Sequence, residues 1–134
     1  MTSTINVFYE LKVADGKAEE LKNIVRNLVA YNQAGEPGTR VYNVYLSLDG
    51  STLTYWESHE DNHAMQFHAE RFANGEFVNQ ILERTTSARL CLYGSVSDEL
   101  KAWSIDHGFE VEYAELIDGF DRTLSTTSPQ PGID

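Results

Sequence analysis

Three of the four histidines of the chain fall within one short stretch, YWESHEDNHAMQFH, which runs from Tyr55 to His68. His59 ends a run typical of a strand, whereas His63 and His68 belong to a segment with helical spacing. Residues five apart lie about 140° apart around a helix, so we do not expect His63 and His68 to share a face. Imidazole titrates near neutral pH, which makes His68 and His59 candidates for proton transfer. The structural alternative for His68 is a hydrogen bond that anchors its helix to the sheet.

The spacing of these histidines does not predict a metal centre. His59 and His63 are four residues apart, but we expect them on different elements. A zinc or non-haem iron site also needs a third ligand in compatible geometry, and no motif in the sequence supplies it. We therefore expect no metal and no other cofactor, and we interpret the histidines as part of an organic pocket.

Glu57 shares strand parity with Tyr55 and His59, so all three side chains should face the same side of a sheet. A carboxylate on the covered side of a sheet is costly unless it is paired. We expect Glu57 to be either a tuned acid or base, or the partner of a basic residue such as Arg40 or Arg89.

Asn43 and Tyr45 share one face of the preceding strand in TRVYNVYLSL. Both side chains can donate a hydrogen bond to an oxyanion, so we include them with the catalytic candidates. The alternative for Tyr45 is a position at the rim of a dimer interface. Four further residues complete the predicted pocket as its lining, although the aromatic ones also suit an ordinary core: Trp56, Phe67, Phe72 and His63.

The elements that must position these residues follow from hydrophobic periodicity, helix caps and turns. Residues 5–13 alternate with a period of two, and the next segment is apolar at every third or fourth position. Asp15, Asp61 and Ser97 are predicted helix caps, and Asp49-Gly50 predicts a hairpin turn. The expected order is strand 5–13, helix 15–35, strands 39–48 and 51–59, helix 61–74, helical turns 76–85, strand 87–96, helix 98–107 and strand 109–116.

This order is the β-α-β-β-α-β arrangement of a ferredoxin-like α+β sandwich, followed by a C-terminal α-β extension. Helices should cover only one face of the sheet. We expect the open sheet face to pair with a second copy of the chain, giving a homodimer that forms a dimeric α+β barrel. Residues 1–122 are expected to form one domain, and 123–134 a disordered tail rich in Ser, Thr and Pro.

The composition excludes several classes of partner. The chain has 134 residues, with 10 basic against 21 acidic side chains and a net charge of -11, which disfavours nucleic acid and anionic membranes. The single cysteine, Cys91, lies in an apolar run, so we expect a buried thiol and no disulfide within the chain. The N-terminus lacks the pattern of a secretion signal, and we expect a cytoplasmic protein.

Three local patterns resemble the antibiotic biosynthesis monooxygenase family. The first is the EPG turn at residues 36–38, which leads into a strand. The second combines Glu57, Asp61, Ala64 and His68 around a strand-to-helix passage. The third is LYGSVSDELKAW through LIDGFDR, which resembles a βαβ-like segment appended in some relatives of the family. The resemblance covers roughly residues 5–122. It implies a dimeric α+β barrel and, for some members, cofactor-independent oxygenation of phenols or quinols, in which the electron-rich anion of the substrate activates oxygen.

The chain departs from the family pattern at one position, because His59 stands where an aromatic residue is common. On this resemblance we expect a monooxygenase acting on a small aromatic or quinol-like metabolite. Two alternatives stay open. One is a binding or stress-response protein with the same fold and no chemistry, and the other is an isomerase or cyclase that needs no oxygen.

Overall fold

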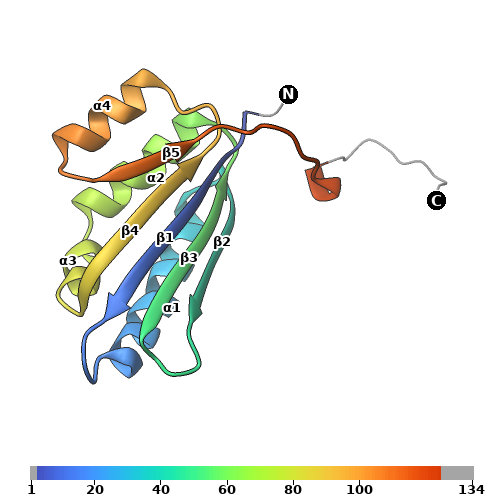
Figure 1. Cartoon of the computed structure of the whole chain (residues 1–134). Coiled ribbons are helices and arrows are strands. Elements are labelled where there is room, and N and C mark those ends of the chain that lie inside the picture. Colours follow the sequence, from blue (N-terminus) through green and yellow to red (C-terminus); the bar gives the residue numbers. More distant parts are fainter. Residues whose placement is uncertain (1–2, 125–134) are drawn as a thin grey trace.

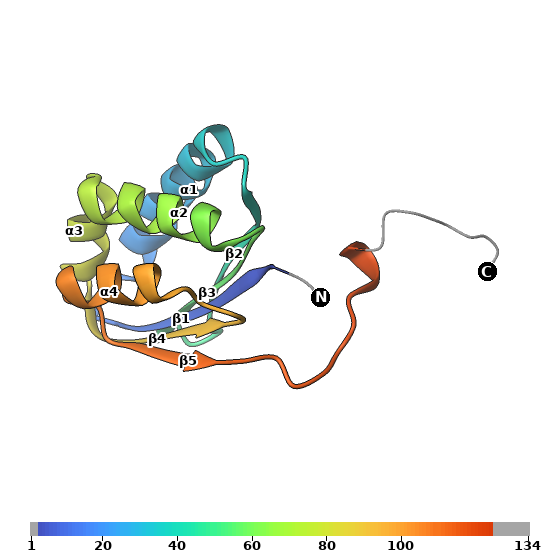
Figure 2. The ribbon, with the colours of Figure 1, turned by 90° about the horizontal axis from the view of Figure 1, so that it is seen from above.

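The computed structural model describes residues 3–124, in which four α-helices lie on one face of a five-stranded sheet. Figure 2 shows this arrangement from above, with every helix on the same side of the strands. The α+β prediction is therefore confirmed. The elements (Figure 1) are β1 (Ile5–Val13), α1 (Ala18–Gly35), β2 (Thr39–Leu46), β3 (Thr52–His59), α2 (Asn62–Asn74), α3 (Phe77–Leu82), β4 (Thr85–Tyr93), α4 (Asp98–Asp106), β5 (Val111–Ala114) and a short 3-10 helix (Arg122–Leu124).

The strands lie in the order β2-β3-β1-β4-β5. All neighbours are antiparallel except β4 and β5, which run parallel because α4 forms the crossover between them. The period of two in β1 leaves Ile5, Val7 and Leu11 buried, as the sequence predicts. In β3 the same alternation brings Glu57 and His59 to the face that the helices cover.

The helix caps agree with prediction at two of three helices. The Asp61 side chain accepts a hydrogen bond from the Ala64 N–H at 2.8 Å, and Ser97 caps α4 in the same way at 3.1 Å. The prediction that Asp15 caps α1 is wrong. Residues 15 and 16 form a turn in which Gly16 has a φ of 76°, and the helix begins only at Ala18 with no side-chain cap.

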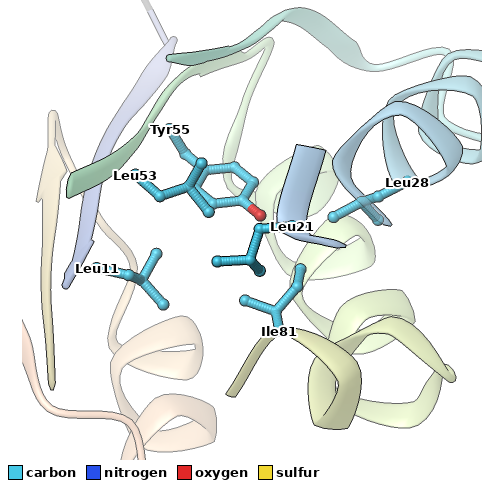
Figure 3. Packing of buried hydrophobic residues seen from close by; sticks show 6 residues of the cluster. All are labelled: Leu11, Leu21, Leu28, Leu53, Tyr55 and Ile81. Atoms are coloured by element: carbon cyan, nitrogen blue, oxygen red, sulfur yellow. The ribbon is translucent and has the colours of Figure 1, made fainter. Parts of the chain in front are cut away.

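Two clusters of buried apolar side chains hold the helices to the sheet. Figure 3 shows the first cluster, in which side chains of α1 and α3 meet those of β1 and β3. Its members are Leu11, Leu21, Leu28, Leu53, Tyr55 and Ile81. The second cluster joins α2 and α4 to β1 and β4 through Ile5, Val7, Met65, Leu92 and Leu100. The candidate site described below lies beside this second cluster.

The C-terminal extension consists of α4 and β5. It is present as predicted, but its strand is shorter, because pairing with β4 runs only from Val111 to Ala114. Cys91 is a buried free thiol, as expected. No helix within residues 3–124 is long and apolar enough to cross a membrane. The predicted tail, apart from residues 123 and 124, lies outside the described residues.

Candidate functional site

The centre of the candidate site is a buried carboxylate, Glu57, with an imidazole on each side. Glu57 and His59 are two residues apart on β3, so both side chains point to the helices. His68 lies on the buried side of α2, and the Asp61 cap fixes where this helix begins after the strand. All three side chains are almost fully buried, with exposed fractions of 3% for Glu57, 0% for His59 and 6% for His68.

A second carboxylate, Glu36, approaches from the turn between α1 and β2. The turn sits close to α2 because Gly38 has no side chain: a Cβ at this position would lie 2.6 Å from the Cβ of Ala64. Glu36 also receives a hydrogen bond from Arg71 Nε at 3.0 Å, one turn after His68 on the same helix. Glu36 is the first residue of the EPG turn, so this turn places a second carboxylate in the site. Only 3% of Glu36 is exposed.

Five contacts join these groups into a closed ring. His59 Nε2 lies 2.9 Å from Glu57 Oε1, and His59 Nδ1 lies 3.0 Å from the Thr39 hydroxyl. The hydroxyl lies 2.9 Å from Glu36 Oε1, which lies 2.8 Å from His68 Nδ1. His68 Nε2 closes the ring at 3.3 Å from Glu57 Oε1. Every polar atom of both imidazoles therefore has a partner.

The number of hydrogens in the ring limits how many of its five contacts can be hydrogen bonds. Five contacts need five hydrogens for all of them to be hydrogen bonds. Thr39 supplies one, the imidazolium form of His68 supplies two, and a neutral His59 supplies one. One of the five contacts then lacks a hydrogen, which leaves one hydrogen-bond position of the ring open.

The charges in the ring reinforce one another. Burial alone would raise the pKa of Glu57, but the positive charge of His68 and hydrogen bonds from His59 and His68 lower it to about 2. Burial alone would lower the pKa of His68, but the negative charge of Glu57 and the hydrogen bond to Glu36 raise it to about 10. The pKa of Glu36 is also lowered, since hydrogen bonds from His68 and Thr39 outweigh its burial. At neutral pH His68 is therefore a cation held between two carboxylates.

A small apolar cavity ends at this cluster. Its volume is about 60 Å³, and Glu57 and His68 line it on one side. Tyr9 lines the same space, and burial and the nearby charge of Glu57 raise the pKa of its phenol to about 12. Most of the remaining wall is apolar and comes from β1, β4 and α2, and from the C-terminal extension: Val7, Met65, Ala69, Phe72, Leu90, Leu92, Leu100, Trp103, Phe109 and Val111.

Four of the predicted site residues meet at this place. His59, His68 and Glu57 form the ring with Glu36 and Thr39, and Phe72 lines the cavity. The expected partners of Glu57 are wrong: Arg40 pairs with Glu60 and Arg89 with Glu112, both near the surface, while Glu57 contacts the two histidines.

The structure does not bring the other predicted residues to this cluster. Asn43 and Tyr45 pair with Trp56 and Thr54 of β3, so they lie on the opposite, uncovered face of the sheet together with Trp56. The prediction of a single pocket that contains both these residues and the histidines is therefore corrected, because neighbouring positions on a strand point to opposite faces. Two residues of α2 face outward instead of toward the sheet: His63 and Phe67.

Sequence reasoning missed Glu36 and Thr39, which were assigned only to a turn and a strand start. The signal for Glu36 was the EPG turn itself, since a glycine at its end allows the close approach to α2. Tyr9 was expected only as a buried strand residue. Trp103 and Phe109 could not be placed, because α4 and β5 reach the cavity only through the tertiary fold.

The same cluster contains three side chains of types that can bind a metal ion. One carboxylate oxygen of Glu57 and one nitrogen each of His59 and His68 lie within 4.8 Å of one another. Sequence spacing did not predict a third ligand, because Glu57 was interpreted only as an acid, a base or the partner of a basic residue. Glu57 was overlooked as a ligand, although residues two apart on a strand share a face.

Comparison with known proteins assigns the chain to a family. The family profile described as antibiotic biosynthesis monooxygenase matches residues 4–79, more than half of the chain. The chain belongs to the antibiotic biosynthesis monooxygenase family. No match was found among curated proteins. Both β3 and α2 lie inside the matched region, so the cluster of Glu57, His59 and His68 is built on the family scaffold.

Solved structures share this fold. MupZ from Pseudomonas fluorescens has a TM-score of 0.78 at 17% identity, with 92% of this chain and 93% of that chain covered. A protein from Nitrosomonas europaea, named as a candidate antibiotic biosynthesis monooxygenase, has a TM-score of 0.62 at 15% identity, covering 73% of this chain and 95% of its own. Rv0793 from Mycobacterium tuberculosis has a TM-score of 0.57 at 19% identity, with coverages of 72% and 98%. At these identities the likeness concerns the fold alone.

Proposed function

We propose that this member of the antibiotic biosynthesis monooxygenase family is a cofactor-independent monooxygenase for a small phenolic or quinol-like metabolite. The observation that carries the proposal is the apolar cavity whose polar end consists of Glu57, His68 and Tyr9. Such a space suits a substrate with one ionisable oxygen and an apolar body. A cavity in contact with charged groups also favours an enzyme over a binding protein without chemistry.

The roles follow from the charges at the cavity end. His68 is cationic at neutral pH, so its positive charge at the cavity wall stabilises the substrate oxyanion, and it does not act as the initial base. The phenol of Tyr9 stays protonated and is a hydrogen-bond donor. The hydroxyl proton of the substrate passes to Glu57, which lines the cavity, and from there to His59, whose Nε2 lies 2.9 Å from Glu57 Oε1.

Oxygenation of a phenol to a quinone by this route balances without a cofactor. One atom of O₂ becomes the new quinone oxygen and the other leaves as water, while the substrate supplies both electrons and both hydrogens of that water. The volume of about 60 Å³ is small beside the ~150 Å³ of a cavity that accepts benzene. A bound ring must therefore displace wall residues such as Trp103, which favours one ring over several.

The proposal is tested by oxygen consumption with single-ring hydroquinones and with hydroxynaphthalenes as a larger series. We expect turnover that survives a chelator and is faster for the single-ring compounds. Oxygen uptake no faster than in buffer for both series would contradict a monooxygenase function. Mass spectrometry after reaction in ¹⁸O₂ would show one labelled oxygen in the product.

An isomerase or cyclase is the second candidate, and the charged ring itself favours it. A cation held between two carboxylates is an acid-base pair, and such a pair can move a proton on a carbonyl substrate without oxygen. Anaerobic incubation separates the two functions. Conversion of a hydroxylated carbonyl substrate at an equal rate with and without O₂ would support the isomerase or cyclase.

We also propose that the uncovered sheet face forms a homodimer. Trp56 and Tyr45 are 47% and 56% exposed on this face, and Phe8 packs edge-on to Trp56. Water-exposed aromatic side chains on one face are typical of an interface. Trp56→Asp is expected to raise the dimer dissociation constant by at least ~100-fold, as measured by sedimentation equilibrium. The matched control, Glu60→Gln at the exposed residue that follows the same strand, should leave the dimer intact.

A further inference from the structure

We propose that Glu57, His59 and His68 form a binding site for one divalent transition-metal ion. This inference does not depend on the proposed oxygenation, because it concerns binding without substrate. It rests on the type of the three ligands, on their distances, and on the groups that hold the two histidines from behind.

The ligand set matches the chemistry of such ions. Two imidazole nitrogens and one carboxylate oxygen suit zinc, iron(II) and cobalt(II), whereas calcium and magnesium prefer oxygen ligands alone. The site is buried, so the ion would meet little competition from bulk water. Glu57 and His68 both line the cavity, which leaves room for a water molecule or a substrate oxygen as a further ligand.

The distances between the ligand atoms are close to those of a loaded site. Metal-ligand bonds of about 2.0–2.2 Å place neighbouring ligand atoms about 3.0–3.5 Å apart. His59 Nε2 and His68 Nε2 lie 2.9 and 3.3 Å from Glu57 Oε1, and the full set lies within 4.8 Å. An ion therefore needs only a small shift of the carboxylate and the loss of the protons that now lie between these atoms.

The outer groups orient both imidazoles for this task. Metal-binding histidines usually donate their second N–H to a carboxylate, a carbonyl or water, which fixes the ring and its tautomer. His68 Nδ1 lies 2.8 Å from Glu36, and His59 Nδ1 lies 3.0 Å from Thr39, whose hydroxyl donates to the same Glu36 oxygen. When the ion displaces the protons between these atoms, both Nδ1 atoms keep their hydrogens toward Glu36 and Thr39, and both Nε2 lone pairs then point toward the ion.

Titration of chelator-treated protein with Co²⁺ tests the site directly. We expect visible absorption bands of low-symmetry cobalt that saturate at one ion per chain, and Zn²⁺ should abolish them. His59→Gln keeps a donor toward Glu57 but loses the nitrogen ligand, so it should lower the affinity by more than ~100-fold. Thr39→Val removes only the outer group and should weaken binding by roughly 10–100-fold.

The control is His107→Gln, which removes an exposed histidine that could bind cobalt at the surface. It should leave the titration unchanged. Circular dichroism establishes that each variant is folded, and Thr39→Val keeps the test decisive if His59→Gln does not fold. The absence of bands at millimolar Co²⁺, equal binding by His59→Gln and Thr39→Val, or loss of binding in His107→Gln would each overturn the proposal.

Discussion

Glu57→Gln is expected to lower the free energy of unfolding by about 3–5 kcal/mol, because it removes one partner of a buried charged pair and leaves the His68 cation with only one of its two carboxylates. The amide also presents an N–H donor to imidazoles that are themselves donors. Urea unfolding in the presence of a chelator measures the effect on metal-free protein. A loss below ~1 kcal/mol would contradict the charged state assigned to the ring.

The pH dependence of this loss gives a second, independent readout. The pKa of Glu57 falls from 4.5 to about 2 on folding, so its contribution is present above pH 4.5 and disappears as pH falls toward 2. The pKa of His68 rises from 6.5 to about 10, so its contribution is full below pH 6.5 and disappears as pH rises through 10. The difference between parent and Glu57→Gln should therefore be largest between pH 4.5 and 6.5.

The matched control for this substitution is Glu60→Gln. Glu60 lies three residues further along the chain, where it pairs with Arg40 at 3.7 Å and both side chains are about half exposed. Exposed ion pairs contribute about 0–1 kcal/mol, so this variant should unfold almost like the parent. A similar loss in both variants would show that amide substitution, and not burial of the charge, causes the effect.

The helices and strands could be predicted from the sequence, because the signals for them are local. The period of two in β1, the Asp61 and Ser97 caps and the Asp49-Gly50 turn each act within a few residues, and the structure has them. The prediction of a cap at Asp15 was wrong, because a local cap signal is weak and another local structure can replace it. A turn at Gly16 satisfies the backbone there, so the side chain is not needed.

Only part of the site could be predicted from the sequence. Glu57 and His59 follow from strand parity, but the ring depends on Glu36, which is 32 positions from His68 and meets it only because α1, β2 and α2 converge. Asn43 and Tyr45 were assigned to the wrong face relative to the histidines, since parity within one strand does not set parity across a hairpin. The register between the two strands sets which residues share a face, and here Tyr42 lies opposite Glu57.

His68→Gln is expected to lower kcat for the proposed substrates by roughly 10²–10⁴-fold, which is the range for loss of a positioned proton donor. The side chain loses its cation and with it the charge that holds the oxyanion in the cavity. KM should change much less, because most of the substrate surface contacts the apolar wall. Steady-state oxygen uptake by variant and parent, at equal folded fractions, gives both constants.

A purely structural role of His68 would give a different result. Loss of an anchor would lower the amount of folded enzyme, but each folded molecule would keep its turnover. His68→Ala opens space beside the cavity, so added imidazole can bind there, and a rate that rises with imidazole but not with a non-basic ring of similar size would assign the effect to the cation. Gln66→Ala, on the outer side of the same helix, should retain the parent kcat and controls for disturbance of α2.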